Sequence, residues 1–122
     1  MRKPSTQELL GIVDSLSPDE VIRLALALGN VDSPAGHEQE AGEYIFRWLD
    51  ERGFDPRKVG LLPERFNVVG RLKGTGEGLT LVFNSHMDTS VAADEQWSTT
   101  YAADSIYHKA WQEGEFIFGN GV

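Results

Sequence analysis

The stretch "LTLVFNSHMDTS", residues 79–90, places a histidine and an aspartate directly after an apolar run. Residues 79–83 are apolar on both faces of an extended chain, which is typical of a strand in a sheet covered by helices on each side. In α/β folds, functional groups gather at the carboxyl ends of such strands. His86 and Asp88 lie at this end, so the stretch predicts an α/β fold with its functional site here.

Three helices are predicted before this strand. Residues 5–16 and 17–30 both begin with a serine followed three positions later by a glutamate, the capping-box pattern that satisfies free helix N–H groups. The two pairs are Ser5 with Glu8 and Ser17 with Glu20. The second helix also has Pro18 at its first position and Gly29 at its end. Because this helix is apolar almost all round, we expect it to be buried.

Residues 36–53 form the clearest amphipathic pattern in the chain. Five apolar residues recur there at helical spacing and make one stripe. They are Ala41, Tyr44, Ile45, Trp48 and Leu49. After this helix the pattern changes to short strands, predicted over residues 58–62, 65–72 and 79–83, and strand character returns over residues 115–122. Helices followed by strands indicate α/β layering.

Bulk composition restricts the possible functions. The chain has 122 residues, a formal net charge of −8 and a pI near 4.7. An acidic balance of this size argues against nucleic acid and anionic membranes as partners. The chain has no cysteine, which excludes disulfides and thiolate metal sites. Because it shows no secretory signal and no apolar run near the roughly 20 residues of a membrane span, we expect a soluble, cytoplasmic protein.

The spacing of His86 and Asp88 suits a metal site. In an extended segment, residues two apart point to the same side, so the two side chains can share one face while Met87 turns away. A neutral imidazole binds a divalent metal through one nitrogen, and a carboxylate on the other nitrogen fixes its tautomer. Alone, a His-x-Asp sequence more often marks the end of a strand than a metal site, and its neighbours decide between the two interpretations.

Four motifs in order resemble the start of the zinc-dependent exopeptidase and deacylase family, which includes aminoacylases, acetylornithine deacetylases, glutamate carboxypeptidases and tripeptidases. Members show a Ser-Pro or Ser-Gly-x-Glu helix start, an Arg-x-Asn-Val strand, a Gly-His-x-Asp-Thr strand end and a Gly-x-Gly-x-x-Asp motif. The corresponding stretches here are "SPAGHE" (33–38), "RFNVVG" (65–70), "NSHMDTS" (84–90) and "GNGV" (119–122). Together they are far more specific than any one of them.

The resemblance implies roles for individual residues. His86 matches the family's first metal-ligand histidine, and Asp88 matches the catalytic-site aspartate that orients it. Gly119 and Gly121 match the glycines before an aspartate that bridges two zinc ions, a position that would fall beyond Val122. The implied cofactor of the complete protein is therefore a pair of divalent metal ions, zinc above all. Because a lone imidazole binds zinc weakly, we expect this chain by itself to bind the metal weakly or not at all. Nothing in this chain identifies substrate-binding residues.

The resemblance also implies a fold and an activity. The fold would be a three-layer α/β/α sandwich, with residues 1–122 as the N-terminal part of its catalytic domain. The complete protein would cleave a peptide or N-acyl amide bond of a small amino-acid-like substrate and form a homodimer. Because each metal needs several ligands and this chain offers one clear candidate, we expect residues 1–122 to be inactive alone.

Other interpretations stay open. A non-catalytic acidic α/β module that binds a protein partner could keep only the family's scaffold. A different metallohydrolase centred on His86 would need a second histidine nearby. His37 and His108 are better explained as a solvated helix start and as surface packing. Four aromatic residues could line a substrate pocket or anchor a long surface loop: Trp97, Tyr101, Tyr107 and Trp111.

Overall fold

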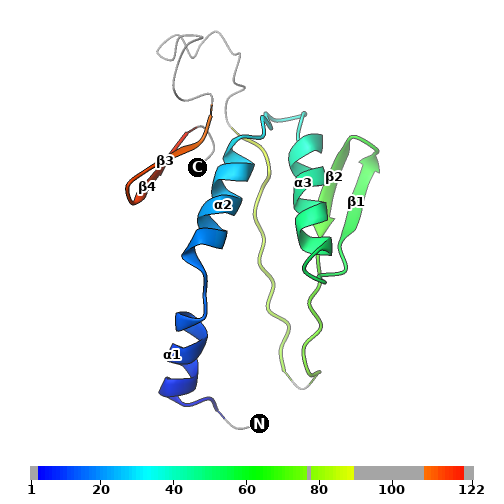
Figure 1. Cartoon of the computed structure of the whole chain (residues 1–122). Coiled ribbons are helices and arrows are strands. Elements are labelled where there is room, and N and C mark those ends of the chain that lie inside the picture. The colour runs from blue at the N-terminus through cyan, green and yellow to red at the C-terminus, as the bar shows by residue number, and fades with distance from the viewer. Residues whose placement is uncertain (1–2, 77, 90–108, 120–122) are drawn as a thin grey trace.

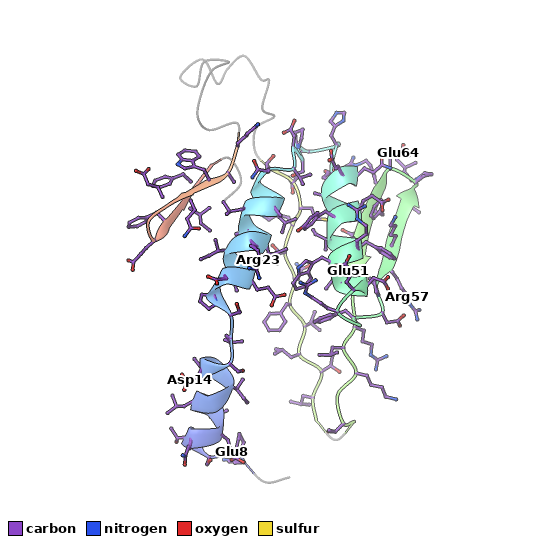
Figure 2. All side chains as sticks on the ribbon, in the orientation of Figure 1. Glu8, Asp14, Arg23, Glu51, Arg57 and Glu64 are labelled. Carbon is purple, nitrogen blue, oxygen red and sulfur yellow. The ribbon has the colours of Figure 1, made fainter. Side chains whose placement is uncertain are left out.

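The first helix, α1 (Thr6–Asp14), stands apart from the other elements of the computed structural model, which describes residues 3–76, 78–89 and 109–119 (Figure 1). The predicted capping box is confirmed. The Ser5 amide donates to Glu8 Oε2 over 2.7 Å, and the Glu8 amide donates to Ser5 Oγ over 3.3 Å. No residue of α1 is buried, and its side chains from Glu8 to Asp14 project into open space (Figure 2). Its cap therefore stabilises the helix locally, without support from packing.

The second helix, α2 (Pro18–Gly29), begins at the predicted proline and ends at the predicted glycine. Its predicted capping box is wrong, because the Ser17 side chain makes no capping hydrogen bond. The Glu20 carboxylate is engaged elsewhere: its Oε1 accepts from the Arg52 guanidinium over 2.7 Å. The prediction of burial is also wrong, since no residue of α2 is buried. Its apolar side chains from Ile22 to Leu28 are half-buried, and Val21 is exposed.

The third helix, α3 (Gln39–Asp50), follows the predicted stripe and contains two buried residues, Ala41 and Gly42. It ends in a Schellman motif around Gly53, whose φ of 73° suits glycine. The Phe54 amide donates to the Leu49 carbonyl over 3.0 Å, and the Gly53 amide donates to the Asp50 carbonyl over 3.0 Å. This ending turns the chain directly into the first strand.

Strands β1 (Arg57–Leu62) and β2 (Arg65–Val69) form an antiparallel hairpin against α3. Both were predicted. The helix approaches β2 closely at Gly42, where an added Cβ would lie 2.8 Å from Phe66 Cε2. Lys58 Nζ lies 5.0 Å from the centroid of the Phe46 ring and 4.9 Å from that of the Phe66 ring. These contacts join α3, β1 and β2 into one packed unit, which we call the α3 hairpin unit.

The predicted strand at residues 79–83 is wrong. These residues are extended but belong to no strand, and the Phe83 side chain is 88% exposed. A strand requires a neighbour for its backbone N–H and C=O groups, and no described residue pairs with this segment. Further along, Thr89 forms a parallel bridge with Pro34. Residues 79–88 thus have no strand partner among the described residues, and the chain pairs with the loop between α2 and α3 at Thr89.

The last described strands, β3 (Trp111–Glu113) and β4 (Phe116–Phe118), form a second antiparallel hairpin. The rings of Trp111 and Phe118 are stacked, with centroids 5.2 Å apart. Asn30, the C-cap of α2, anchors the residue before β3, because its side-chain amide pairs with both the carbonyl and the N–H of Ala110. After β4, an added Cβ at Gly119 would lie 2.7 Å from Ala110 Cα, so glycine is required there.

The mixed α/β class is confirmed by helices together with two small antiparallel sheets, each of two strands. The described residues do not show a three-layer sandwich, so that fold stays a prediction. Within the described part of the chain, no helix has both the length and the apolar character needed to cross a membrane.

Candidate functional site

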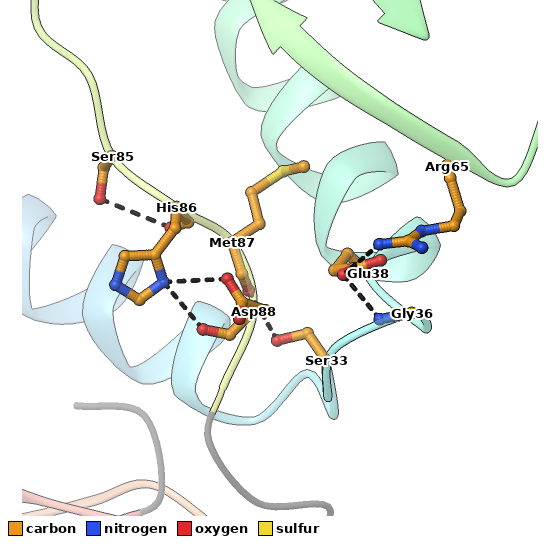
Figure 3. Close-up of polar contacts among 8 residues, drawn as sticks. All are labelled: Ser33, Gly36, Glu38, Arg65, Ser85, His86, Met87 and Asp88. Atoms are coloured by element: carbon orange, nitrogen blue, oxygen red, sulfur yellow. Dashed lines mark hydrogen bonds and ion pairs between the residues drawn. The ribbon is translucent and has the colours of Figure 1, made fainter. Parts of the chain in front are cut away.

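His86 and Asp88 lie in contact at the end of the extended segment (Figure 3). His86 Nδ1 is 3.2 Å from Asp88 Oδ1 and 2.9 Å from the Asp88 carbonyl oxygen. The Met87 side chain projects away from the imidazole, as the alternation of an extended chain requires. The side chains of His86 and Asp88 are 81% and 45% exposed, so both are accessible to a ligand from solution.

The two oxygens that face Nδ1 determine where the proton of the neutral ring lies. A backbone carbonyl and an ionised carboxylate can only accept hydrogen bonds. Nδ1 of His86 must therefore be the donor to Asp88, and Nε2 then carries the free lone pair. A lone pair on an exposed imidazole nitrogen is what a divalent metal ion binds.

The loop before α3 holds the backbone of this segment. Ser33 Oγ donates to the Met87 carbonyl over 2.9 Å, and the Thr89 amide donates to the Ser33 carbonyl over 2.8 Å. Ser33 is only 3% exposed. Ser33 begins the motif at residues 33–38, but the sequence does not indicate this role, because its partner Met87 lies 54 positions away.

A charged cluster beside the site fixes the same loop to the α3 hairpin unit (Figure 3). Glu38 Oε1 accepts from the Gly36 amide over 2.7 Å and from Arg65 over 3.3 Å. The hydrogen bond from the Gly36 amide lowers the pKa of Glu38 below its ordinary value of 4.5, and the Glu38 amide and Arg65 lower it further. Glu38 is thus held as a carboxylate that ties the loop to β2.

Other predicted residues do not join His86. His37 lies on an open depression beside α3 together with Glu40 and Glu43. Among residues 3–76, 78–89 and 109–119, no group of three or more histidine, cysteine, aspartate or glutamate residues could hold a metal ion. Trp111 lies in β3, whereas five predicted residues lie outside the described ones: Trp97, Tyr101, Tyr107, His108 and Gly121.

Comparison with known proteins points to hydrolases. No protein-family model matches the chain. It is similar to the N-formyl-4-amino-5-aminomethyl-2-methylpyrimidine deformylase of Bacillus subtilis (strain 168), with 35% identity over 85 residues. The match covers 65% of this chain and 20% of the deformylase, so the chain spans about a fifth of the length of this curated relative. The similarity is to part of a hydrolase that acts on a small N-formyl compound.

Proposed function

We propose that this chain is the N-terminal part of the catalytic domain of a metal-dependent hydrolase that cleaves the amide bond of a small N-acyl compound. The proposal includes membership of the zinc-dependent exopeptidase and deacylase family, which the four sequence motifs suggest. The observation that carries it is the pairing of His86 Nδ1 with Asp88, which leaves Nε2 of an exposed ring free.

The residues present fit one metal ligand of such a site. Nε2 of His86 would bind the ion, and Asp88 would hold the ring in the required tautomer and raise its basicity through Nδ1. A bound divalent ion supplies Lewis-acid polarisation of the substrate carbonyl and lowers the pKa of a bound water. The second ion of the proposed pair and the remaining ligands would need further residues, because the described part of the chain has no group of three or more potential metal ligands.

The substrate class follows from the relative and the family together. A formamide is the smallest N-acyl amide, so a deformylase and an N-deacylase hydrolyse the same type of bond. The similarity to an N-formyl-aminomethylpyrimidine deformylase favours a small N-acyl or N-formyl compound over a long peptide. Exopeptidase activity is the second alternative within the same proposal, because it requires the same attack on a carbonyl carbon.

A chimera tests this function. The segment of the Bacillus subtilis deformylase that matches this chain is replaced by the corresponding residues of this chain, and formate release is measured with zinc present. We expect an active chimera that loses more than about 100-fold in kcat upon His86→Ala, because a metal ligand is removed. His37→Ala is the matched control and should leave the rate unchanged, since His37 lines a depression beside α3 that His86 does not line. An active chimera in which His86→Ala has no effect would contradict the proposal.

A further inference from the structure

We infer that Ser33 is a positioning residue that sets the tautomer of His86 and thereby the nitrogen offered to a metal ion. The metal part of this inference rests on the proposed function, whereas the tautomer part does not. The hydrogen bonds of Ser33 go to Met87 and Thr89, and not to the imidazole or the carboxylate. It acts on the two peptide groups that flank Asp88.

Both flanking peptide groups are bonded to the same residue. The carbonyl of the Met87–Asp88 peptide accepts from Ser33 Oγ, and the N–H of the Asp88–Thr89 peptide donates to the Ser33 carbonyl. Asp88 therefore has its backbone fixed on both sides by one residue of the loop before α3. Such a two-point attachment restricts rotation of both peptide planes.

The second of these peptide groups reaches His86 directly. Its carbonyl oxygen, that of Asp88, lies 2.9 Å from His86 Nδ1, while its N–H is the group held by Ser33. Because N–H and C=O of one peptide lie in one plane, fixing the N–H aims the carbonyl at the ring. Since that carbonyl can only accept, it places the proton on Nδ1 and the lone pair on Nε2.

Burial makes Ser33 a more effective anchor than an exposed serine. Ser33 is 3% exposed, whereas the side chains of His86 and Asp88 are 81% and 45% exposed, and the Ser33 hydroxyl donates to the Met87 carbonyl. Removal of the hydroxyl leaves the Met87 carbonyl without this donor in a partly buried position. Ser85 offers a matched comparison, because it is adjacent to His86 but exposed, with its hydroxyl 3.5 Å from the His86 carbonyl.

The experiment compares Ser33→Ala, Ser33→Thr and Ser85→Ala in the 122-residue chain. The first readout is the ¹⁵N chemical shift of each imidazole nitrogen of His86 in its neutral form, which distinguishes a protonated nitrogen from an unprotonated one. The second is the affinity for zinc, measured by titration of the same resonances. A change in folding stability alone does not move the first readout in the folded protein.

Ser33→Ala removes the hydroxyl bond to the Met87 carbonyl and keeps the main-chain bond to Thr89, so it frees the first of the two peptide planes beside Asp88. We expect Nδ1 protonated in the unsubstituted chain, in Ser33→Thr and in Ser85→Ala, and a mixture of tautomers in Ser33→Ala. Zinc affinity should fall about 10-fold in Ser33→Ala, at the low end of the range for residues that orient metal ligands. A folded Ser33→Ala variant with the tautomer of the unsubstituted chain would overturn the inference. So would a Ser85→Ala variant altered as much as Ser33→Ala.

Two further outcomes keep the inference separate from the proposed function. If zinc does not bind the unsubstituted chain but Ser33→Ala still changes the tautomer, the positioning role holds, and formate release by the chimera with and without His86→Ala decides the metal assignment. If Ser33→Ala does not fold, Ser33→Thr decides, because it retains the hydroxyl. A folded threonine variant with mixed tautomers contradicts the inference, and one with protonated Nδ1 supports it.

Discussion

The α3 hairpin unit and the extended segment at residues 79–83 are both rich in apolar residues, yet only the first is packed. In the hairpin unit, Phe66 lies against Gly42 and close to the Lys58 amine. In the extended segment, Phe83 is 88% exposed and the backbone has no strand partner among the described residues. The same residue type therefore has two different environments within one chain.

The difference shows that an apolar pattern specifies a buried face only where a partner is available. The stripe of α3 is followed by a Schellman ending that turns the chain back, so β1 and β2 reach the helix within a few residues. The segment at 79–83 follows a glycine-rich stretch, and among the described residues the first bridge after it is the one between Thr89 and Pro34. The helix and strands of the α3 hairpin unit could be predicted from the local sequence, because the packing partners lie close together along the chain.

The largest effect is expected from removing one phenylalanine from each region. Phe66→Ala should destabilise the chain by about 2–3 kcal/mol, below the full value for a buried phenylalanine because Phe66 is half-buried. Phe83→Ala should change stability by less than about 0.5 kcal/mol, as for other surface substitutions. Urea denaturation followed by circular dichroism measures both. Equal effects of the two substitutions would remove the distinction between the regions.

The anchor of the second hairpin gives the next effect. Asn30→Ala should cost about 1–3 kcal/mol, because the Ala110 N–H and carbonyl both lose the partner provided by the Asn30 amide. Asn30→Asp retains an acceptor for the Ala110 N–H and should cost less. Amide hydrogen exchange of residues 111–118 is the measurement, and unchanged protection in Asn30→Ala would contradict an anchoring role.

The Glu38 cluster predicts a pH dependence of the hairpin unit. The pKa of Glu38 is lowered on folding, so its contribution to stability is present above 4.5 and is lost as the pH falls through the folded-state pKa. The expected size is about 1 kcal/mol, because the Arg65 side chain is 55% exposed and its ion pair is screened. Thermal unfolding between pH 6 and pH 3 should show the loss, and Glu38→Gln should remove this component of the pH dependence.

The smallest effect concerns the two helix caps. Ser5→Ala should destabilise α1 by about 0.5–1 kcal/mol and so reduce its helicity, because the Ser5 hydroxyl caps the Glu8 amide. Ser17→Ala should have almost no effect, since Ser17 makes no side-chain capping bond. Chemical shifts of the two helices report each change separately. A larger effect at Ser17 than at Ser5 would show that the caps are assigned to the wrong helices.

Local features of the fold could be predicted from the sequence. The capping box of α1, the first and last residues of α2, the stripe of α3 and the two strands β1 and β2 all depend on residues a few positions apart, although the pairing of these strands was not predicted. Burial of α2 and pairing of residues 79–83 were predicted wrongly, because both depend on partners that sequence periodicity does not identify. The cap of α2 failed for a related reason: Glu20 binds Arg52, a residue 32 positions away.

The site divides in the same way. The contact between His86 and Asp88 spans two positions and follows from the alternation of an extended chain. The long-range contacts of Ser33 and Asn30 were missed, because their partners lie 54 and 80 positions away. Serine and asparagine are common in loops, so neither residue carries a local signal of a long-range role.

The most direct test of the metal site is a zinc titration of the ¹⁵N-labelled 122-residue chain, with the imidazole nitrogens of His86 and His37 observed together. We expect His86 to carry its proton on Nδ1 before zinc is added and zinc then to shift Nε2 of His86 while His37 is unaffected. A proton on Nε2 before zinc, or zinc-induced shifts at His37 with none at His86, would contradict this expectation.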